Sequence, residues 1–316
     1  MSASPKLSSL RDAFGEELAR LGDERSDIVV LDADTSTSTR SAIFGKQHPE
    51  RFINVGLQEQ NMMGMAAGLA SSGKKVFVAG FATFVTGMVY NMIRQSICYP
   101  GLDVTIVASH AGITVGEDGA THQMTEDLGL MAGLPNMKVI SPADAPETKK
   151  VIDYIAGAKG PFYVRLAREK FPEMTDGFDF KLGRGLVLED GSDATVVSTG
   201  ITLHEAAEAV KLLKGNGISA RLIHMPSLKP IDADLLAKAA RETGLIVTVE
   251  DHSIYNGLGS RVAEVVAEGQ PAYVRRVGIR DVFGESGKAE ELMVKYGIDR
   301  TSVAKAVLES MNLKRR

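Results

Sequence analysis

Short runs of β-branched and other apolar residues alternate along this chain with stretches whose apolar residues recur at helical spacing. In the first half, six runs predict strands: Ile28 to Leu31, Phe52 to Val55, Val76 to Ala79, Val104 to Ala108, Lys138 to Ile140 and Phe162 to Leu166. An apolar stripe from Leu7 to Leu21 predicts a helix before them, and Glu59 to Ser72 predicts another that ends at Gly73. This alternation is typical of a mostly parallel sheet.

The pattern lapses from Glu169 to Asp193, a stretch that contains Pro172 and four glycines, and then resumes. Strands are expected at Ala194 to Ser198, Ala220 to His224, Leu245 to Val249 and Tyr273 to Val277, with helical stretches such as Leu203 to Leu213 between them. The sequence therefore predicts an α/β fold of two consecutive doubly wound, mostly parallel-sheet domains. We expect them to span residues 1–180 and 181–316.

Composition narrows the function classes. The chain has 316 residues, 44% hydrophobic and 24% charged, with a net charge of -4 and a pI near 5.9, so no basic face for nucleic acid is expected. No apolar run reaches the roughly 20 residues of a membrane span. Met1 to Leu10 lacks the pattern of a secretory signal, and the single cysteine, Cys98, excludes an internal disulfide framework. We expect a cytoplasmic protein with no nucleic-acid or membrane partner.

Candidate chemistry concentrates after the strand at Val104 to Ala108. The segment Gly116 to Gln123 is a glycine-flanked acidic turn that runs into His122, and His110 lies twelve residues before that histidine. Two imidazoles and a carboxylate in one loop favour a functional role over the structural role that a lone histidine usually has. A metal site is not expected, because no third histidine or cysteine follows at a familiar spacing.

In doubly wound sheets, ligands bind beyond the carboxyl ends of the strands. Candidate residues follow five of the predicted strands: Asp34 and Ser38, Glu59, Phe81 and Phe84, His110, and Arg168. We expect these side chains to share one edge of the first sheet.

Four segments together resemble a known family: Asn54 to Gln60, Gly116 to Gln123, Leu134 to Asn136, and Ser141 to Asp144. The chain resembles transketolase, and more narrowly the carboxyl-terminal chain of a split transketolase. That resemblance covers almost the whole chain, and it implies a pyrimidine-binding domain followed by a transketolase C-terminal domain. The expected activity is transfer of a two-carbon ketol unit between sugar phosphates with thiamine diphosphate as cofactor.

The resemblance implies cofactor-binding roles for four residues. Glu59 matches the glutamate that hydrogen-bonds the aminopyrimidine ring, and Phe81 and Phe84 match aromatic residues that pack against it. Asp34 matches an acid near the cofactor. Taken alone, Glu59 also fits an acidic residue in the first turn of a helix, the phenylalanines fit core packing, and Asp34 fits a turn.

Substrate roles are implied for six residues. His110 and His122 match the histidines that face the sugar, where they handle protons and hydrogen bonds. Asp118 matches a residue that binds a substrate hydroxyl. Arg11, Ser38 and Arg168 match positions that bind the substrate phosphate, although Arg11 also fits a surface charge and Arg168 an ion pair with a local acid.

One family element is missing from the sequence. Thiamine-diphosphate enzymes hold the diphosphate through a metal bridged by a Gly-Asp-Gly segment, and no Gly-Asp-Gly occurs here. The resemblance therefore implies a partner, an N-terminal diphosphate-binding transketolase subunit that holds Mg²⁺ or another divalent cation. Two copies of this chain are expected to associate within a heterotetramer.

Three alternatives stay open. Gln60 and Asn61 follow Glu59, whereas many full-length transketolases have a histidine directly after this glutamate. In this respect the chain resembles split transketolases and 1-deoxyxylulose-phosphate synthase, and that synthase is the first alternative. His110 favours ketol transfer, because the synthase usually lacks a histidine at this position. A β subunit of a 2-oxo-acid dehydrogenase has a similar layout but matches the Gly116 to His122 loop poorly. A regulatory or scaffolding chain with the fold and no turnover is the non-enzyme alternative.

Overall fold

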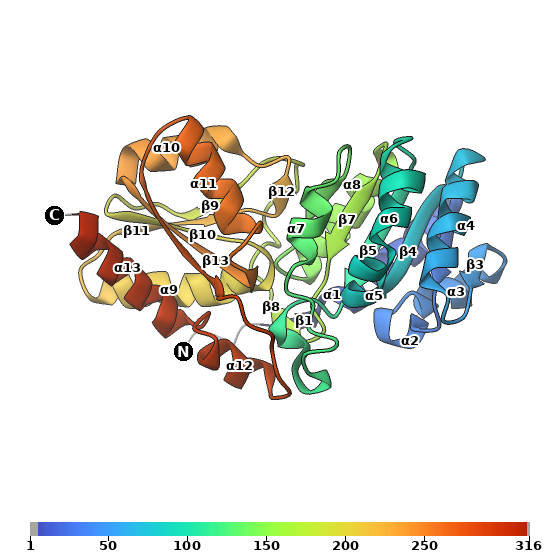
Figure 1. Cartoon of the computed structure of the whole chain (residues 1–316), viewed down its shortest axis with the longest axis horizontal. Coiled ribbons are helices and arrows are strands. Elements are labelled where there is room, and N and C mark those ends of the chain that lie inside the picture. Colours follow the sequence, from blue (N-terminus) through green and yellow to red (C-terminus); the bar gives the residue numbers. More distant parts are fainter. Residues whose placement is uncertain (1–5, 315–316) are drawn as a thin grey trace.

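The computed structural model describes residues 6–314, which form two α/β halves, each built on its own sheet (Figure 1). Met1 to Pro5, half of the segment in which no secretory signal is expected, lie outside the described residues. Within the described part, no helix is both long and apolar enough to cross a membrane.

The first sheet has seven strands in the order β12-β6-β7-β5-β4-β2-β3, and all are parallel except β12. The strands are β2 (Ile28–Asp32), β3 (Phe52–Asn54), β4 (Lys75–Phe81), β5 (Val104–Ser109), β6 (Lys138–Ile140), β7 (Phe162–Arg165) and β12 (Ser227–Lys229). The longer helices of this half are α1 (Leu10–Glu24), α3 (Ala42–Gln47), α4 (Glu59–Ser71), α7 (Asp127–Ala132) and α8 (Ala145–Gly157). Shorter ones are α2 (Ser36–Thr39), α5 (Ala82–Val85), α6 (Tyr90–Met92), the 3₁₀ turns η1 (Pro49–Arg51), η2 (Gly87–Val89) and η4 (Ile113–Asp118), and the π-turn η3 (Ile93–Cys98).

The second sheet has five strands in the order β14-β13-β10-β11-β9, with β9 antiparallel to its neighbour. Its strands are β9 (Leu186–Glu189), β10 (Ala194–Ser198), β11 (Ala220–His224), β13 (Leu245–Ser253) and β14 (Tyr273–Ile279). The helices are the 3₁₀ turn η5 (Gly200–Thr202), α9 (Leu203–Gly215), α10 (Ala233–Thr243), α11 (Leu258–Glu268), α12 (Ala289–Lys295) and α13 (Arg300–Lys314). The predicted class, two mostly parallel α/β sheets in sequence, is confirmed.

The strands of the first sheet are buried on both faces, as parallel strands between helices are. Along β4, Val76 and Val78 pack in one apolar cluster, whereas Phe77 and Ala79 pack in another on the opposite face. Helices α1, α3 and α8 cover the second of these faces, and α4 and α7 cover the first. Each face of the sheet therefore has its own layer of the core.

The beginning of the first helix differs from the prediction. Leu7 was expected in the apolar stripe of that helix, but it lies in β1 (Leu7–Ser9), which pairs with β8 (Lys170–Pro172), and it is exposed. The helix begins at Leu10 because the hydroxyl of Ser9 accepts a hydrogen bond from the backbone N–H of Asp12 and caps it.

The two halves are not independent units. Strand β12 belongs to the second half of the sequence but adds an edge strand to the first sheet, beside β6. The largest apolar cluster also continues from α7 into α10 and α11 of the second half.

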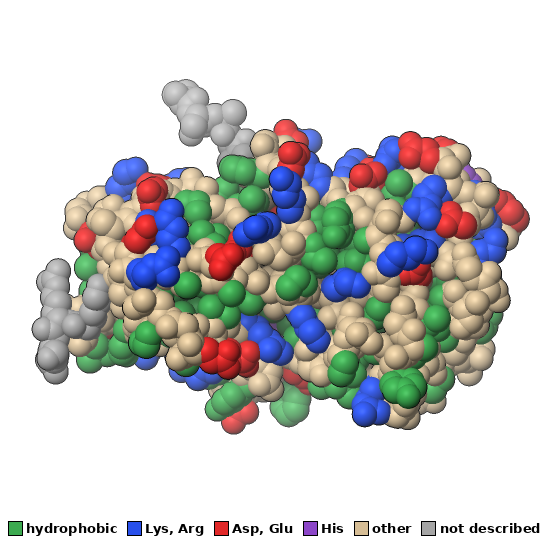
Figure 2. All heavy atoms as spheres, turned by 90° about the horizontal axis from the view of Figure 1, so that it is seen from above, with side chains coloured by type: hydrophobic (Ala, Val, Ile, Leu, Met, Phe, Trp, Pro, Cys, Tyr) green, Lys and Arg blue, Asp and Glu red, His purple; other side chains and the backbone are tan. Residues whose placement is uncertain are grey.

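On the face shown in Figure 2, acidic and basic side chains are interspersed with apolar ones.

Candidate active site

Five neighbouring parallel strands bring the candidate residues to one edge of the first sheet. Counting across the sheet, β3 precedes Glu59, β2 precedes Asp34 and Ser38, β4 ends at Phe81 and precedes Phe84, β5 precedes His110, and β7 precedes Arg168. Because parallel strands end at the same edge, the five segments leave the sheet side by side.

Two phenylalanines and two histidines form a cluster at this edge. The ring centroid of Phe81 lies 3.8 Å from that of His110 in a stacked arrangement and 6.1 Å from that of Phe84. The ring of His122 meets Phe84 edge-on, with centroids 5.6 Å apart. Residues that follow β4 and β5 therefore form one aromatic surface with a histidine at each side.

His110 is held in a strained conformation. Its backbone has a φ of 55°, a region that residues with a side chain rarely adopt, and only 3% of its surface is exposed. Its Nδ1 lies 2.9 Å from the hydroxyl of Ser109, which in turn donates to the carbonyl of Gly80 at 3.4 Å. This arrangement favours the tautomer in which Nδ1–H donates to Ser109 and Nε2 is a free acceptor.

Burial, helped by the nearby charges of Arg11 and Arg168, lowers the pKa of His110 to about 3. The imidazole is therefore neutral at physiological pH. Its free Nε2 can accept a hydrogen bond from a substrate hydroxyl, but the ring does not contribute a positive charge.

Arg11 connects the other two residues that are expected to bind phosphate, Ser38 and Arg168. Its guanidinium donates to the backbone carbonyls of Ser38, at 2.6 Å, and of Arg168, at 2.5 Å. The guanidinium of Arg168 donates to the carbonyl of Val115 at 2.6 Å and lies 3.6 Å from a carboxylate oxygen of Asp118. The cationic residues and Asp118 thus lie together beside the histidines.

Asp34 lies on the other side of the site, in a turn between β2 and β3. Its φ is 65°, and its backbone N–H and carboxylate both bond the side chain of Asn54 at 3.1 Å. Glu59 is half-buried at the first position of α4, and Met62 and Met63 in the next turn are fully buried.

A further acid in this region was not among the predicted residues. Asp32 is fully buried, and its carboxylate accepts hydrogen bonds from the hydroxyls of Thr35, Thr39 and Ser41. Burial raises its pKa, against the effect of these hydrogen bonds. An aspartate at the end of an apolar strand, followed by several Ser and Thr residues, indicates a turn held by side-chain hydrogen bonds. Here that turn includes Ser38.

Among the described residues, no group of three or more His, Cys, Asp or Glu side chains could hold a metal ion. Of the two parts of the expected cofactor, the aromatic rings and the carboxyl of Glu59 suit a heterocycle. A metal-bound diphosphate has no matching ligand set in this part of the chain.

The fold is that of an α/β protein with a candidate ligand site at the strand ends of its first sheet. Two family descriptions match the chain in order: "Transketolase, pyrimidine binding domain" at residues 7–174 and "Transketolase, C-terminal domain" at residues 183–303. The chain belongs to the transketolase family.

Similar proteins include free-standing C-terminal chains. A "Putative transketolase C-terminal section" of Methanocaldococcus jannaschii is 50% identical, with 96% of each chain covered. One subunit of an apulose-4-phosphate transketolase of Phocaeicola vulgatus is 36% identical over 95% of this chain and 96% of that protein. A solved split-gene transketolase, described as an inactive β4 tetramer, is 49% identical with a TM-score of 0.91, over 97% of this chain and 99% of that one.

Proposed function

We propose that this chain is the C-terminal subunit of a thiamine-diphosphate-dependent transketolase that transfers a two-carbon ketol unit from a ketose phosphate to an aldose phosphate. The observation that supports this most is the meeting of two phenylalanines, two histidines and the Arg168–Asp118 pair at one sheet edge. An aromatic surface for a heterocycle beside groups for a polyol and an anion suits this reaction.

The cofactor would bind through its aminopyrimidine end. Phe81 and Phe84 would pack against the ring, Glu59 would hydrogen-bond a ring nitrogen, and Asp34 would lie close to it. Thiamine diphosphate supplies, when bound, the nucleophilic carbon on which the two-carbon unit is transferred. Because the sequence contains no Gly-Asp-Gly segment, we infer that a partner subunit holds the diphosphate and its divalent cation, such as Mg²⁺.

The substrate would bind on the other side of the aromatic surface. Neutral His110 would accept a hydrogen bond from a hydroxyl of the ketose through Nε2, and His122 would exchange protons with the carbonyl or hydroxyl oxygens. Asp118 would accept a hydrogen bond from a sugar hydroxyl. Arg168, Ser38 and Arg11 would bind the phosphate, and Arg11 also holds the other two residues in place through their carbonyl groups.

The partner would be an N-terminal diphosphate-binding transketolase subunit. Support comes from relatives that are themselves C-terminal sections or subunits of about this length, and from the inactivity of the similar β4 tetramer. We propose two copies of this chain in a cytoplasmic heterotetramer, with pyrimidine-binding and C-terminal domains at residues 1–180 and 181–316. The residues proposed to bind the phosphate would accept the phosphate group of several different sugar phosphates.

The test is to assay the chain and an N-terminal transketolase subunit, alone and mixed, for two-carbon transfer between sugar phosphates with thiamine diphosphate and Mg²⁺. Only the mixture should turn over. In the mixture, Glu59→Ala should lower kcat by about 10²-fold or more, because the hydrogen bond to the cofactor is lost. The exposed Glu268→Ala is the matched control and should be neutral.

Full activity of the isolated chain, or an unchanged rate with Glu59→Ala, would contradict the proposal. A mixture that assembles but never turns over any sugar phosphate would support the non-catalytic alternative.

A further inference from the structure

The loop after β5, which includes Asp118 and His122, is fastened to the second half of the chain by a buried carboxylate. Asp251 lies in β13, and 2% of its surface is exposed. One of its oxygens accepts the backbone N–H of Ile113 at 3.0 Å. The other accepts the hydroxyl of Thr114 at 2.7 Å and its N–H at 3.4 Å. Hydrogen bonds to a charged acceptor are stronger than those between neutral groups.

The close approach of this carboxylate requires a glycine. At Gly112, which has a φ of 79°, an added Cβ would lie 2.1 Å from an oxygen of Asp251. The N–H of Gly112 donates to the carbonyl of Met124 at 2.7 Å, which closes the loop on itself. The loop therefore begins and ends beside Asp251.

Gln123 fixes the middle of the loop. Its side-chain amide donates to the carbonyls of Ile113 at 3.2 Å and Gly116 at 3.1 Å, and also to that of Glu285 in the second half at 2.9 Å. Opposite this segment, a Cβ on Gly119 would lie 2.6 Å from the hydroxyl of Ser286. The second half thus contacts the loop on both sides of Asp118.

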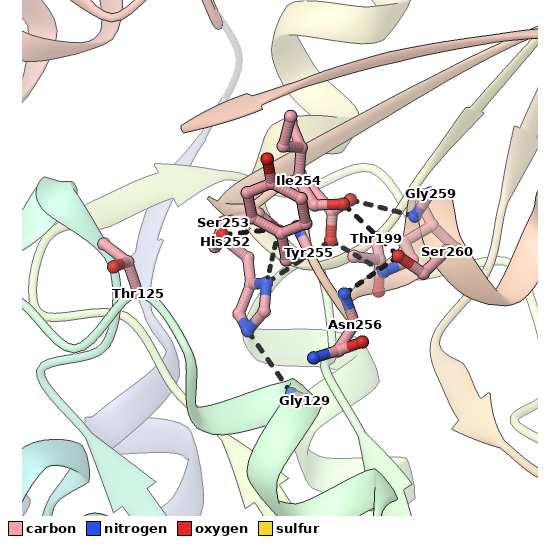
Figure 3. A network of polar contacts seen from close by, with 12 residues as sticks. Thr125, Gly129, Thr199, His252, Ser253, Ile254, Tyr255, Asn256, Gly259 and Ser260 are labelled. Atoms are coloured by element: carbon pink, nitrogen blue, oxygen red, sulfur yellow. Dashed lines mark hydrogen bonds and ion pairs between the residues drawn. The ribbon is translucent and has the colours of Figure 1, made fainter. Parts of the chain in front are cut away.

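The end of β13 also holds the residues that follow the loop. The backbone N–H of Ser253 donates to the carbonyl of Thr125 at 2.7 Å. The imidazole of His252 points toward the N–H of Gly129 in α7, at 3.4 Å (Figure 3). Three consecutive residues of one strand therefore contact the segment from Ile113 to Gly129.

We propose that Asp251 is a positioning residue for substrate binding, which fixes the conformation of the loop that presents Asp118 and His122. The inference rests on the proposed function for its effect on the substrate, but the contact with the loop does not. The C-terminal domain then has a part in the reaction. It supplies no group to the substrate, but it fixes the positions of Asp118 and His122, which do contact the substrate.

This role predicts a selective defect. The groups proposed for the cofactor follow β2, β3 and β4, whereas the loop fastened by Asp251 follows β5. Loosening the loop should therefore weaken the binding of the ketose phosphate and leave thiamine diphosphate binding intact.

The informative variants are Asp251→Asn, which keeps the shape but loses the charge and one acceptor, and Thr114→Val, which removes only the hydroxyl. Glu250→Gln is the matched control. Glu250 is the preceding residue on β13 and is fully buried, but its carboxylate accepts the N–H groups of Leu258 and Gly259 in its own half.

Two measurements are made on each variant. Hydrogen exchange of the isolated chain should be about tenfold faster at the amides of residues 112–123 in Asp251→Asn, and should change less in Thr114→Val. In the complex with the N-terminal subunit, KM for the ketose phosphate should rise about tenfold, with kcat and the cofactor concentration for half-maximal activity within about twofold. Glu250→Gln should leave loop exchange and KM unchanged.

Wild-type loop exchange in both Asp251→Asn and Thr114→Val would overturn the inference, as would an equal rise in KM with Glu250→Gln. If Asp251→Asn does not fold, the same two measurements on Thr114→Val decide. Faster loop exchange in a complex that transfers no two-carbon unit, even as wild type, would support the contact and reject the proposed function instead.

Discussion

His110 combines a strained backbone conformation with burial of a titratable ring. Its backbone is left-handed, and its ring is buried against Phe81 close to two guanidinium groups. Both features cost free energy, so they persist only where the surrounding structure enforces them. The sequence identified His110 through its spacing from His122, but its pKa is lowered mainly by burial and further by Arg11 and Arg168, and these effects come from distant segments of the chain.

The ring of His110 should remain neutral in mildly acidic solution. Its pKa is lowered to about 3, so ¹⁵N NMR of the imidazole should show a neutral ring down to about pH 4. The tautomer with a proton on Nδ1 is expected, because Ser109 donates to Gly80. A ring that titrates near pH 6.5, the usual range for histidine, would contradict the prediction.

The same shift has a consequence for stability. Below about pH 6.5 the unfolded chain takes up a proton at His110 that the folded chain does not, so this residue makes the fold less stable as pH falls from about 6.5 toward 3. At pH 5 the loss should be about 1–2 kcal/mol relative to pH 7. Denaturant unfolding of wild type and His110→Asn at both pH values measures it, since the variant lacks this ionisation.

At the scale of elements, two motifs that identify the family prove to be structural. In the Ser141 to Asp144 motif, Asp144 is fully buried and caps α8 by accepting the N–H of Glu147 at 3.0 Å. Its carboxylate also accepts the N–H groups of Met174 and Thr175, so it ties the connection between the halves to the helix. In the Leu134 to Asn136 motif, the side chain of Asn136 donates to the carbonyl of Cys98 at 2.9 Å.

We expect Asp144→Ala to lower the free energy of unfolding by about 3 kcal/mol or more, because it removes a helix cap and leaves several buried N–H groups unpaired. Asp153→Ala is the matched control on the same helix. Asp153 is exposed, and among the described residues it pairs with Arg20 alone, so its loss should cost less than about 1 kcal/mol. Equal effects of the two substitutions in urea unfolding would show that the cap network is not important.

The strands that the sequence predicted and those that it missed differ in where their information lies. Lys138–Ile140, Ala194–Ser198 and Ala220–His224 were predicted to the residue, because each is an apolar run between helical stretches. The strands that were missed, β1, β8, β9 and β12, are short and have their pairing partners in distant segments. No local pattern marks such strands, since their partners decide their conformation.

The candidate site shows the same division. Residues that follow strands with a clear apolar run could be placed at one edge of the sheet from the sequence pattern alone. The contacts of Asp251 with Ile113 and Thr114 could not, because they span 138 and 137 residues of sequence. Nothing near Asp251 distinguishes it from any other acid in an apolar strand.

At the scale of the whole molecule, the two halves share a core. Leu128 and Met131 of α7 belong to the same apolar cluster as Met225, Leu228 and Leu258 of the second half. Removing the second half would therefore expose the apolar residues of α7 that pack against it.

Polar contacts reinforce this shared core at the end of α7. The amine of Lys229 in β12 donates to the carbonyls of Ala132, at 3.0 Å, and Leu134, at 2.5 Å. These carbonyls lie at the end of α7 and just after it, where a cation is favourable. A positive charge from the second half thus completes a helix end in the first half.

We therefore expect the full chain to unfold in a single calorimetric transition, with equal calorimetric and van't Hoff enthalpies, in spite of its two sheets. A fragment of residues 1–180 lacks β12 and the apolar cover of α7, so it should show no cooperative transition or melt at least about 10 °C lower. Two resolved transitions in the full chain, or a fragment as stable as the whole, would mean that each half folds alone. In that case the addition of β12 to the first sheet, and the contact of Asp251 with the loop, would add little to folding stability.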